Sequence, residues 1–80
     1  MRILDDKRDV SVDTVILYLT RSEACELRDS IASLLDGDGT GHEHTPSDDY
    51  TKEITVCLYD EETSLSHFDE RSIRLIRENR

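Results

Sequence analysis

The sequence predicts an α+β fold, a small two-layer unit with a β-α-β core in which one main helix covers a short sheet. Apolar residues alternate over 14–19 and again over 52–59, and they recur at helical spacing over 21–35. An alternation of two residues is typical of strands, whereas a period of 3.6 indicates a helix. A C-terminal arm or short helix completes the prediction. Because the chain has 80 residues, we expect a single domain over 1–80.

The first strand is predicted over Thr14–Leu19, where most residues are β-branched or aromatic. Before it, residues 1–12 predict a short strand or turn at Ile3 and Leu4 and a charged loop over 5–9. In the strand, apolar side chains fall on both faces, with Val15, Leu17 and Leu19 on one face and Ile16 and Tyr18 on the other. Such a strand is expected to be covered on both sides, or on one side and by a partner.

The helix is predicted over 21–35, directly after Thr20. Thr20 and Glu23 have the spacing of a capping box, in which each side chain accepts a hydrogen bond from the other residue's amide. Gly37 follows the last periodic position, where a left-handed residue is expected to end the helix. The apolar stripe consists of Ala24, Leu27, Ile31, Leu34 and Leu35.

Residues 36–51 predict a loop, because they contain all three glycines and the only proline. A short extended piece in this loop would place His42 and His44 on the same side, and Ser47 would cap a single helical turn over 48–50. The second strand is predicted over Lys52–Tyr59, paired with the strand over 14–19. Parallel pairing by a crossover and antiparallel pairing both remain open.

The C-terminal region predicts a polar loop over 60–66 and then either a short helix or an extended arm. Arginines recur every three residues here, but the net charge of −9 opposes binding to a phosphate backbone. We expect these arginines to pair with carboxylates of this chain or of a second copy. The candidate protein-binding residues are Tyr50, Arg71, Arg74 and Arg77, and Arg80 continues the arginine series.

The loop also holds a candidate metal site. Imidazole and carboxylate side chains are ligands for zinc and other divalent ions, so a divalent metal such as zinc is the candidate cofactor. The four residues are His42, His44, Asp48 and Asp49. The same histidines could serve a small hydrolase with Ser47 or Cys57 as nucleophile, but no nucleophile elbow or phosphate-binding glycine loop follows a strand. Cys25 and Cys57 fall in apolar patterns typical of small buried residues.

Composition favours a small acidic interaction protein without enzymatic activity, similar in kind to an immunity or inhibitor protein. The chain has 19 acidic and 10 basic residues, so its surface suits a partner with a basic face. Two strands and one helix bury little, which favours a homodimer. The alternative is a metal- or small-ligand-binding protein that uses the loop over 42–49. We expect a cytoplasmic location and no membrane partner, because neither a signal peptide nor a long apolar run is present.

Three segments carry a recurring pattern: LYLTRSEACELRDSIASLL, HEHTPSDDYTKEITVCLYD and FDERSIRLI. Together they resemble a family of small bacterial and phage proteins of unassigned function. The shared pattern is a strand followed by an LTxxEAxEL helix, an HxH loop and a KEIT strand, and it covers residues 15–76. The resemblance implies a bacterial or phage source and one domain. It implies no activity and no catalytic residues, and it draws attention to Asp49, Tyr50, Lys52 and Glu53.

Overall fold

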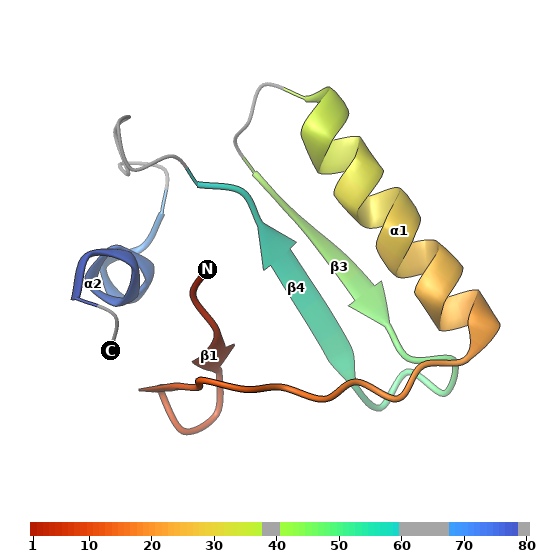
Figure 1. Ribbon diagram of the computed structural model, residues 1–80, viewed down its shortest axis with the longest axis horizontal. Coiled ribbons are helices and arrows are strands. Elements are labelled where there is room, and N and C mark those ends of the chain that lie inside the picture. The colour runs from red at the N-terminus through yellow and green to blue at the C-terminus, as the bar shows by residue number, and fades with distance from the viewer. Residues whose placement is uncertain (38–40, 60–67, 79–80) are drawn as a thin grey trace. The chain divides into compact units, whose positions relative to one another are not determined.

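The computed structural model describes residues 1–37, 41–59 and 68–78. Within these ranges the chain forms two helices and two small antiparallel sheets, which confirms the α+β class (Figure 1). Contacts divide the molecule into two compact units. The first unit joins Met1–Leu17 to the C-terminal helix, and the second begins at Tyr18 and runs through the strands that follow the long helix. The single-domain assignment stays a prediction.

In the first unit, β1 (Leu4–Asp5) and β2 (Val10–Ser11) form a short antiparallel hairpin. The predicted charged loop over 5–9 is the turn of this hairpin. The Asp5 carboxylate accepts hydrogen bonds from the backbone N–H groups of Lys7 and Arg8, both at 3.1 Å. The side chain of Asp5 therefore supplies the acceptor for two N–H groups that have no backbone carbonyl partner among the described residues of so short a turn.

The C-terminal segment forms a helix, α2 (Glu70–Glu78), so the helical alternative is correct and the extended arm is not. Asp69 caps it, because its carboxylate accepts a hydrogen bond from the Ser72 N–H at 2.7 Å. Leu75 and Ile76 are buried. The Nε of Arg2 donates to the Ile76 carbonyl at 3.1 Å, which links the N-terminal residues to this helix. The predicted loop over 60–66 lies outside the described residues.

The second unit is built on α1 (Arg21–Asp36), which confirms the predicted helix and its capping box. The Glu23 N–H donates to Thr20 Oγ1 at 3.1 Å, and the Thr20 N–H donates to Glu23 Oε1 at 2.8 Å. Gly37 follows the last helical residue as predicted, but the left-handed conformation expected there is wrong. Gly37 has φ −85° and ψ −160°, which is extended, and its N–H donates to the Leu34 carbonyl at 3.3 Å.

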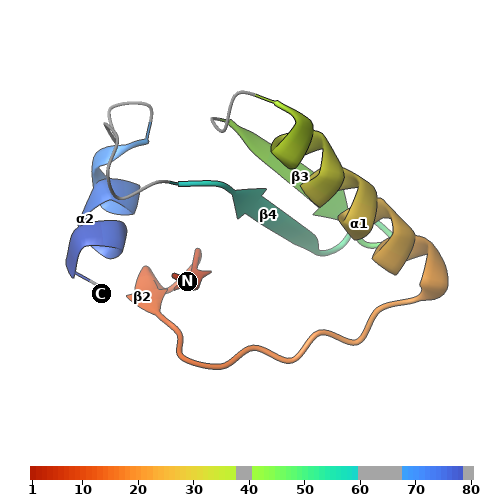
Figure 2. The ribbon, with the colours of Figure 1, turned by 45° about the horizontal axis from the view of Figure 1, so that its top comes forward.

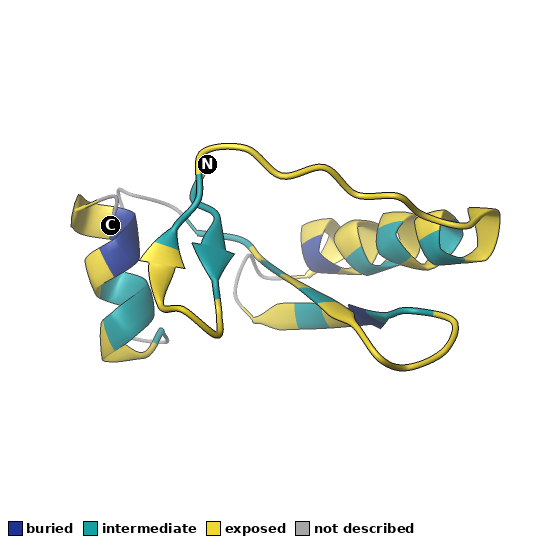
Figure 3. Ribbon diagram, turned by 90° about the horizontal axis from the view of Figure 1, so that it is seen from below, coloured by how far each residue is buried: buried dark blue, intermediate teal, exposed yellow. Residues whose placement is uncertain are grey.

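The sheet of this unit pairs β3 (His42–Pro46) with β4 (Glu53–Cys57) in antiparallel register. Figures 1 and 2 show α1 running alongside β3, with β4 on the other side of β3. Figure 3 shows the helix and the strands as two layers. Two predictions are therefore wrong: residues 36–51 are not a continuous loop, because they contain β3, and the partner of β4 is β3 rather than residues 14–19.

Residues 14–19 form no strand within the described part of the molecule, so the strand predicted over Thr14–Leu19 is wrong as a description of this structure. The segment leads into α1 as an extended, exposed chain (Figure 3). The residue types favour a strand, but a strand also requires a neighbour for its backbone hydrogen bonds. Here no described strand lies against it.

Candidate protein-binding site

The exposed segment, defined as residues 14–19, presents five large apolar side chains to solvent. Their exposed fractions are 53% for Val15, 71% for Ile16, 47% for Leu17, 91% for Tyr18 and 38% for Leu19. Within the described residues, no hydrogen bond involves the backbone or side chains of this segment. A contiguous apolar run that is exposed on both faces is typical of an interaction site.

Thr20 fixes the point where the exposed segment meets α1. Its hydroxyl accepts from the Glu23 N–H and donates to the Asp48 carboxylate at 2.7 Å. The Asp48 N–H in turn donates to Glu23 Oε2 at 2.8 Å. Hydrogen bonds from the Thr20 and Asp48 amides lower the pKa of Glu23 below its ordinary value. The start of the helix is thereby tied to the turn between β3 and β4.

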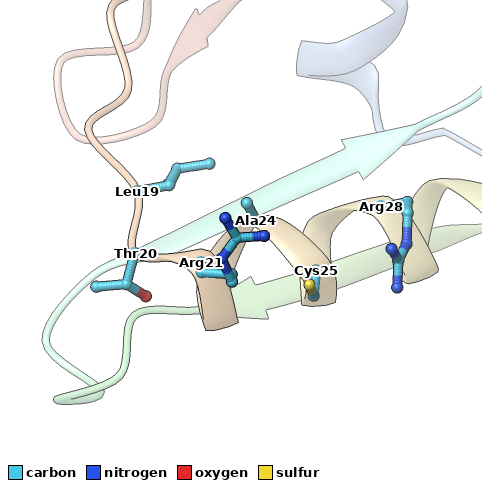
Figure 4. Close-up of a pocket in the computed structure, with 6 residues that line it drawn as sticks. All are labelled: Leu19, Thr20, Arg21, Ala24, Cys25 and Arg28. Atoms are coloured by element: carbon cyan, nitrogen blue, oxygen red, sulfur yellow. The ribbon is translucent and has the colours of Figure 1, made fainter.

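An open recess lies at this joint, between the end of the exposed segment and the first turns of α1 (Figure 4). Arg28 is held by the Asp29 carboxylate at 3.0 Å, and this contact raises the pKa of Arg28. Cys25 is half-buried here, and Cys57 on β4 is exposed, so the prediction that both cysteines are buried is wrong for Cys57. The recess is lined by Leu19, Thr20, Arg21, Ala24, Cys25 and Arg28.

The apolar stripe of α1 is only half covered. Leu34 is buried with 6% of its surface exposed, whereas Ile31 and Leu35 are 40% and 67% exposed. Because successive helical residues turn by about 100°, Ser30 and Ser33 lie on one side of Leu34, and Ile31 and Leu35 lie on the other. The serine side contacts β3, since the Ser30 and Thr45 hydroxyls are 3.1 Å apart and Ser33 donates to Glu43 at 3.2 Å. The opposite side is open.

One face of the sheet carries the apolar residues of β4, and the other face is polar. Ile54 and Val56 of β4 are paired with Thr45 and Glu43 of β3, so all four share the face that α1 contacts. Ile54 and Val56 remain half-exposed, because α1 packs mainly on β3. The other face carries His42, His44, Glu53 and Thr55.

The predicted metal residues are divided between two places. His42 and His44 lie on the same side of β3, as expected for an extended piece, with ring centroids 4.9 Å apart. Nδ1 of His44 lies 2.8 Å from the Thr55 hydroxyl and 3.3 Å from a Glu53 carboxylate oxygen. Asp48 and Asp49 belong to the turn after β3. In the described ranges, no group of three or more His, Cys, Asp or Glu side chains is placed to hold a metal ion. The metal site stays a prediction.

The turn after β3 is a hairpin connection rather than the predicted helical turn. Ser47 Oγ accepts from the N–H groups of Thr51 and Lys52 at 3.2 and 3.0 Å, and it donates to Asp49 at 2.7 Å. Hydrogen bonds from Ser47 and Thr51 lower the pKa of Asp49 to about 2. Tyr50 is 83% exposed and has φ 60°, a left-handed conformation that is strained for a residue with a bulky side chain. Its predicted role in protein binding stays a prediction.

The arginines of α2 contact carboxylates of their own unit. Arg71 binds Asp6 at 2.7 Å and Asp9 at 3.6 Å, and Arg74 lies 3.8 Å from Asp9. The Asp6 carboxylate raises the pKa of Arg71. Pairing with the chain's own carboxylates was one of the two predicted outcomes. Arg77 is exposed, and Arg80 lies outside the described residues. A role of Arg71, Arg74 and Arg77 in protein binding stays a prediction.

The sequence predicts the apolar character of the segment, and the cover expected on its faces is absent among the described residues. Sequence reasoning missed the half-open side of α1 and the half-exposed Ile54 and Val56. The signal in the sequence was the pair Ser30 and Ser33, which are three residues apart and mark a polar side of the helix. The apolar stripe beside them is wider than one strand can cover.

No protein-family model, curated protein or solved structure matches this chain. Among the described residues, no helix is both long enough and apolar enough to cross a membrane.

Proposed function

We propose that this protein is a small acidic interaction protein without enzymatic activity, and that it binds a protein partner through the exposed segment. One observation supports the proposal most strongly: five consecutive large apolar residues, Val15–Leu19, are exposed in an extended conformation. Leaving such a run in water is unfavourable by about 25 cal/mol for each Å² of apolar surface. A partner that covers it gains that free energy.

The extended backbone favours binding by strand addition. In this mode, a peptide in β conformation pairs its N–H and C=O groups with the edge of a sheet, and alternate side chains enter pockets. The strand-favouring residue types of the segment fit that role. The net charge of −9 complements a partner with a basic face, as in immunity and inhibitor proteins, and long-range attraction would speed the encounter.

Site-specific photo-crosslinking tests the proposal. A photoreactive phenylalanine analogue placed at Tyr18, which is 91% exposed, is expected to crosslink to a protein when the full chain is irradiated in cells of its source. The matched control carries the same analogue at Asp29, an exposed position on the polar side of α1. Equal yields from the two positions, measured by mass spectrometry of the purified adducts, would show that the segment is no binding site.

A further inference from the structure

We infer that the exposed segment of one copy adds as a strand to the outer edge of β4 in a second copy, and that the two copies exchange segments reciprocally. This inference rests on the proposed function: it keeps the exposed segment as the binding site and names a second copy as the partner, so it uses no charge complementarity. Among the described residues, each chain contains both halves of the contact, namely a segment without a neighbouring strand and a β4 edge without a second strand. A contact in which each copy supplies both halves closes as a two-fold dimer.

The proposed accepting surface combines β4 with the open side of α1. Ile54 and Val56 of β4 are half-exposed, and Ile31 and Leu35 are exposed on the side of α1 away from its serines. Among the described residues, β4 pairs on one side only, with β3. An added strand would therefore bond to the outer backbone groups of β4 over residues 53–56 and bury one of its apolar faces against these four side chains.

The edge of β3 is less suitable for an apolar strand. Its residues on the helix-facing side are Glu43 and Thr45, and both are already bonded to serines of α1. A strand beside β3 would face that polar side of the helix. The apolar residues that remain open are instead on β4 and on the far side of Leu34. The side-chain chemistry therefore selects β4.

The short connection between the exposed segment and α1 favours pairing with a second copy over pairing with the sheet of the same chain. A strand beyond β4 would lie two strand spacings, or about 10 Å, from β3, alongside which α1 runs. Thr20 alone separates Leu19 from the first residue of α1, and one extended residue spans about 3.5 Å. While Thr20 keeps its bonds to Glu23 and Asp48, only one residue is available to carry the chain from α1 toward a strand beside its own β4. Short connections of this kind favour exchange between copies.

The test uses the full untagged chain. Light scattering after gel filtration is expected to give 18.4 kDa, twice the chain mass of 9.2 kDa. In a refolded equimolar mixture of ¹³C-labelled and unlabelled chains, isotope-filtered NOE spectra are expected to connect side chains of Val15–Leu19 in one copy with methyl groups of Ile31, Leu35, Ile54 and Val56 in the other.

The variant Ile16→Pro removes one backbone donor and constrains the strand, so we expect the dimer dissociation constant to rise on the order of tenfold or more. Ile16→Val is the matched control, since it keeps the amide and the β-branched side chain, and it should dimerise as the natural chain does. Far-UV circular dichroism at low concentration should be the same for both variants, because residue 16 makes no hydrogen bond to the described residues.

Three results would overturn the inference. The first is a monomer at all concentrations, and the second is a dimer without the expected contacts between copies. The third is equal dimerisation of the two variants. A monomer that nevertheless crosslinks through position 18 to a different protein would reject strand exchange and leave the proposed function standing. Failure of the crosslink at position 18 to any protein would reject both.

Discussion

Asp49 holds the hairpin turn between β3 and β4. Its Oδ1 atom accepts from the Ser47 hydroxyl at 2.7 Å and from the Thr51 N–H and hydroxyl at 3.1 and 2.7 Å. These donors favour the charged carboxylate, and they lower its pKa from 3.8 to about 2. The turn is therefore stabilised by the ionised form of one exposed side chain.

The pH dependence follows from this lowered pKa. Since the folded pKa of Asp49 lies below the unfolded value, its contribution to stability is complete above about pH 4 and is lost as the pH falls toward 2. Asp49→Asn should reduce the loss of melting temperature across this interval compared with the natural chain. A carboxyl ¹³C titration should place the midpoint for Asp49 near pH 2. A midpoint near 4 would contradict the hydrogen-bonded turn.

Residue chemistry also explains which local predictions succeeded. Thr20 and Glu23 predict a helix start because the capping box is a short-range arrangement that four residues complete by themselves. Gly37 was expected in a left-handed conformation, but its N–H reaches the Leu34 carbonyl from an extended conformation. Glycine permits the left-handed region without requiring it.

At the scale of elements, α1 was predicted correctly and β3 was missed. The helix carries its own signals in its cap and its apolar spacing. The sequence HEHTP of β3 contains no alternating apolar run and lies among residues that favour turns, so only its pairing with β4 makes it a strand. Residues 14–19 show the converse, because their residue types favour a strand and no described neighbour supplies the pairing. Strand formation depends on a partner that local sequence does not specify.

The neighbouring leucines of α1 should respond differently to truncation. Leu34→Ala removes a buried side chain and is expected to lower the free energy of unfolding by about 2–4 kcal/mol. Leu35→Ala removes one that is 67% exposed, so it should cost less than about 1 kcal/mol in a single copy. Urea denaturation at low protein concentration gives both values.

The same pair distinguishes the covered side of α1 from its open side. If a second copy covers Leu35, Leu35→Ala should raise the dimer dissociation constant even though it barely changes the stability of one copy. An unchanged dissociation constant for Leu35→Ala would show that the open side of α1 takes no part in association.

At the scale of the molecule, the two units bury few apolar side chains. Among the described residues, the buried apolar side chains are Leu34 in one unit and Leu75 and Ile76 in the other. Small domains bury a low fraction of their surface, so their stability gains much from association. The exposed segment and the open side of α1 supply apolar surface for that gain. The composition predicts that few apolar side chains are buried. The position of the exposed apolar surface follows only from the fold.

The effect of salt on binding distinguishes a second copy from a partner with a basic face, because salt changes the two affinities in opposite directions. Each chain carries −9, so two copies repel, and added salt screens that repulsion. Dimerisation should therefore tighten severalfold between about 0.05 and 0.5 M sodium chloride, where the Debye length falls below 10 Å. Binding to a basic protein would weaken over the same range.

Asp13→Lys changes an exposed residue beside the segment and brings the charge of each chain to −7. This variant should reduce the effect of salt on the dimer. Analytical ultracentrifugation across the salt series measures both. Dissociation that increases with salt would show that opposite charges, rather than the apolar segment, hold the complex together.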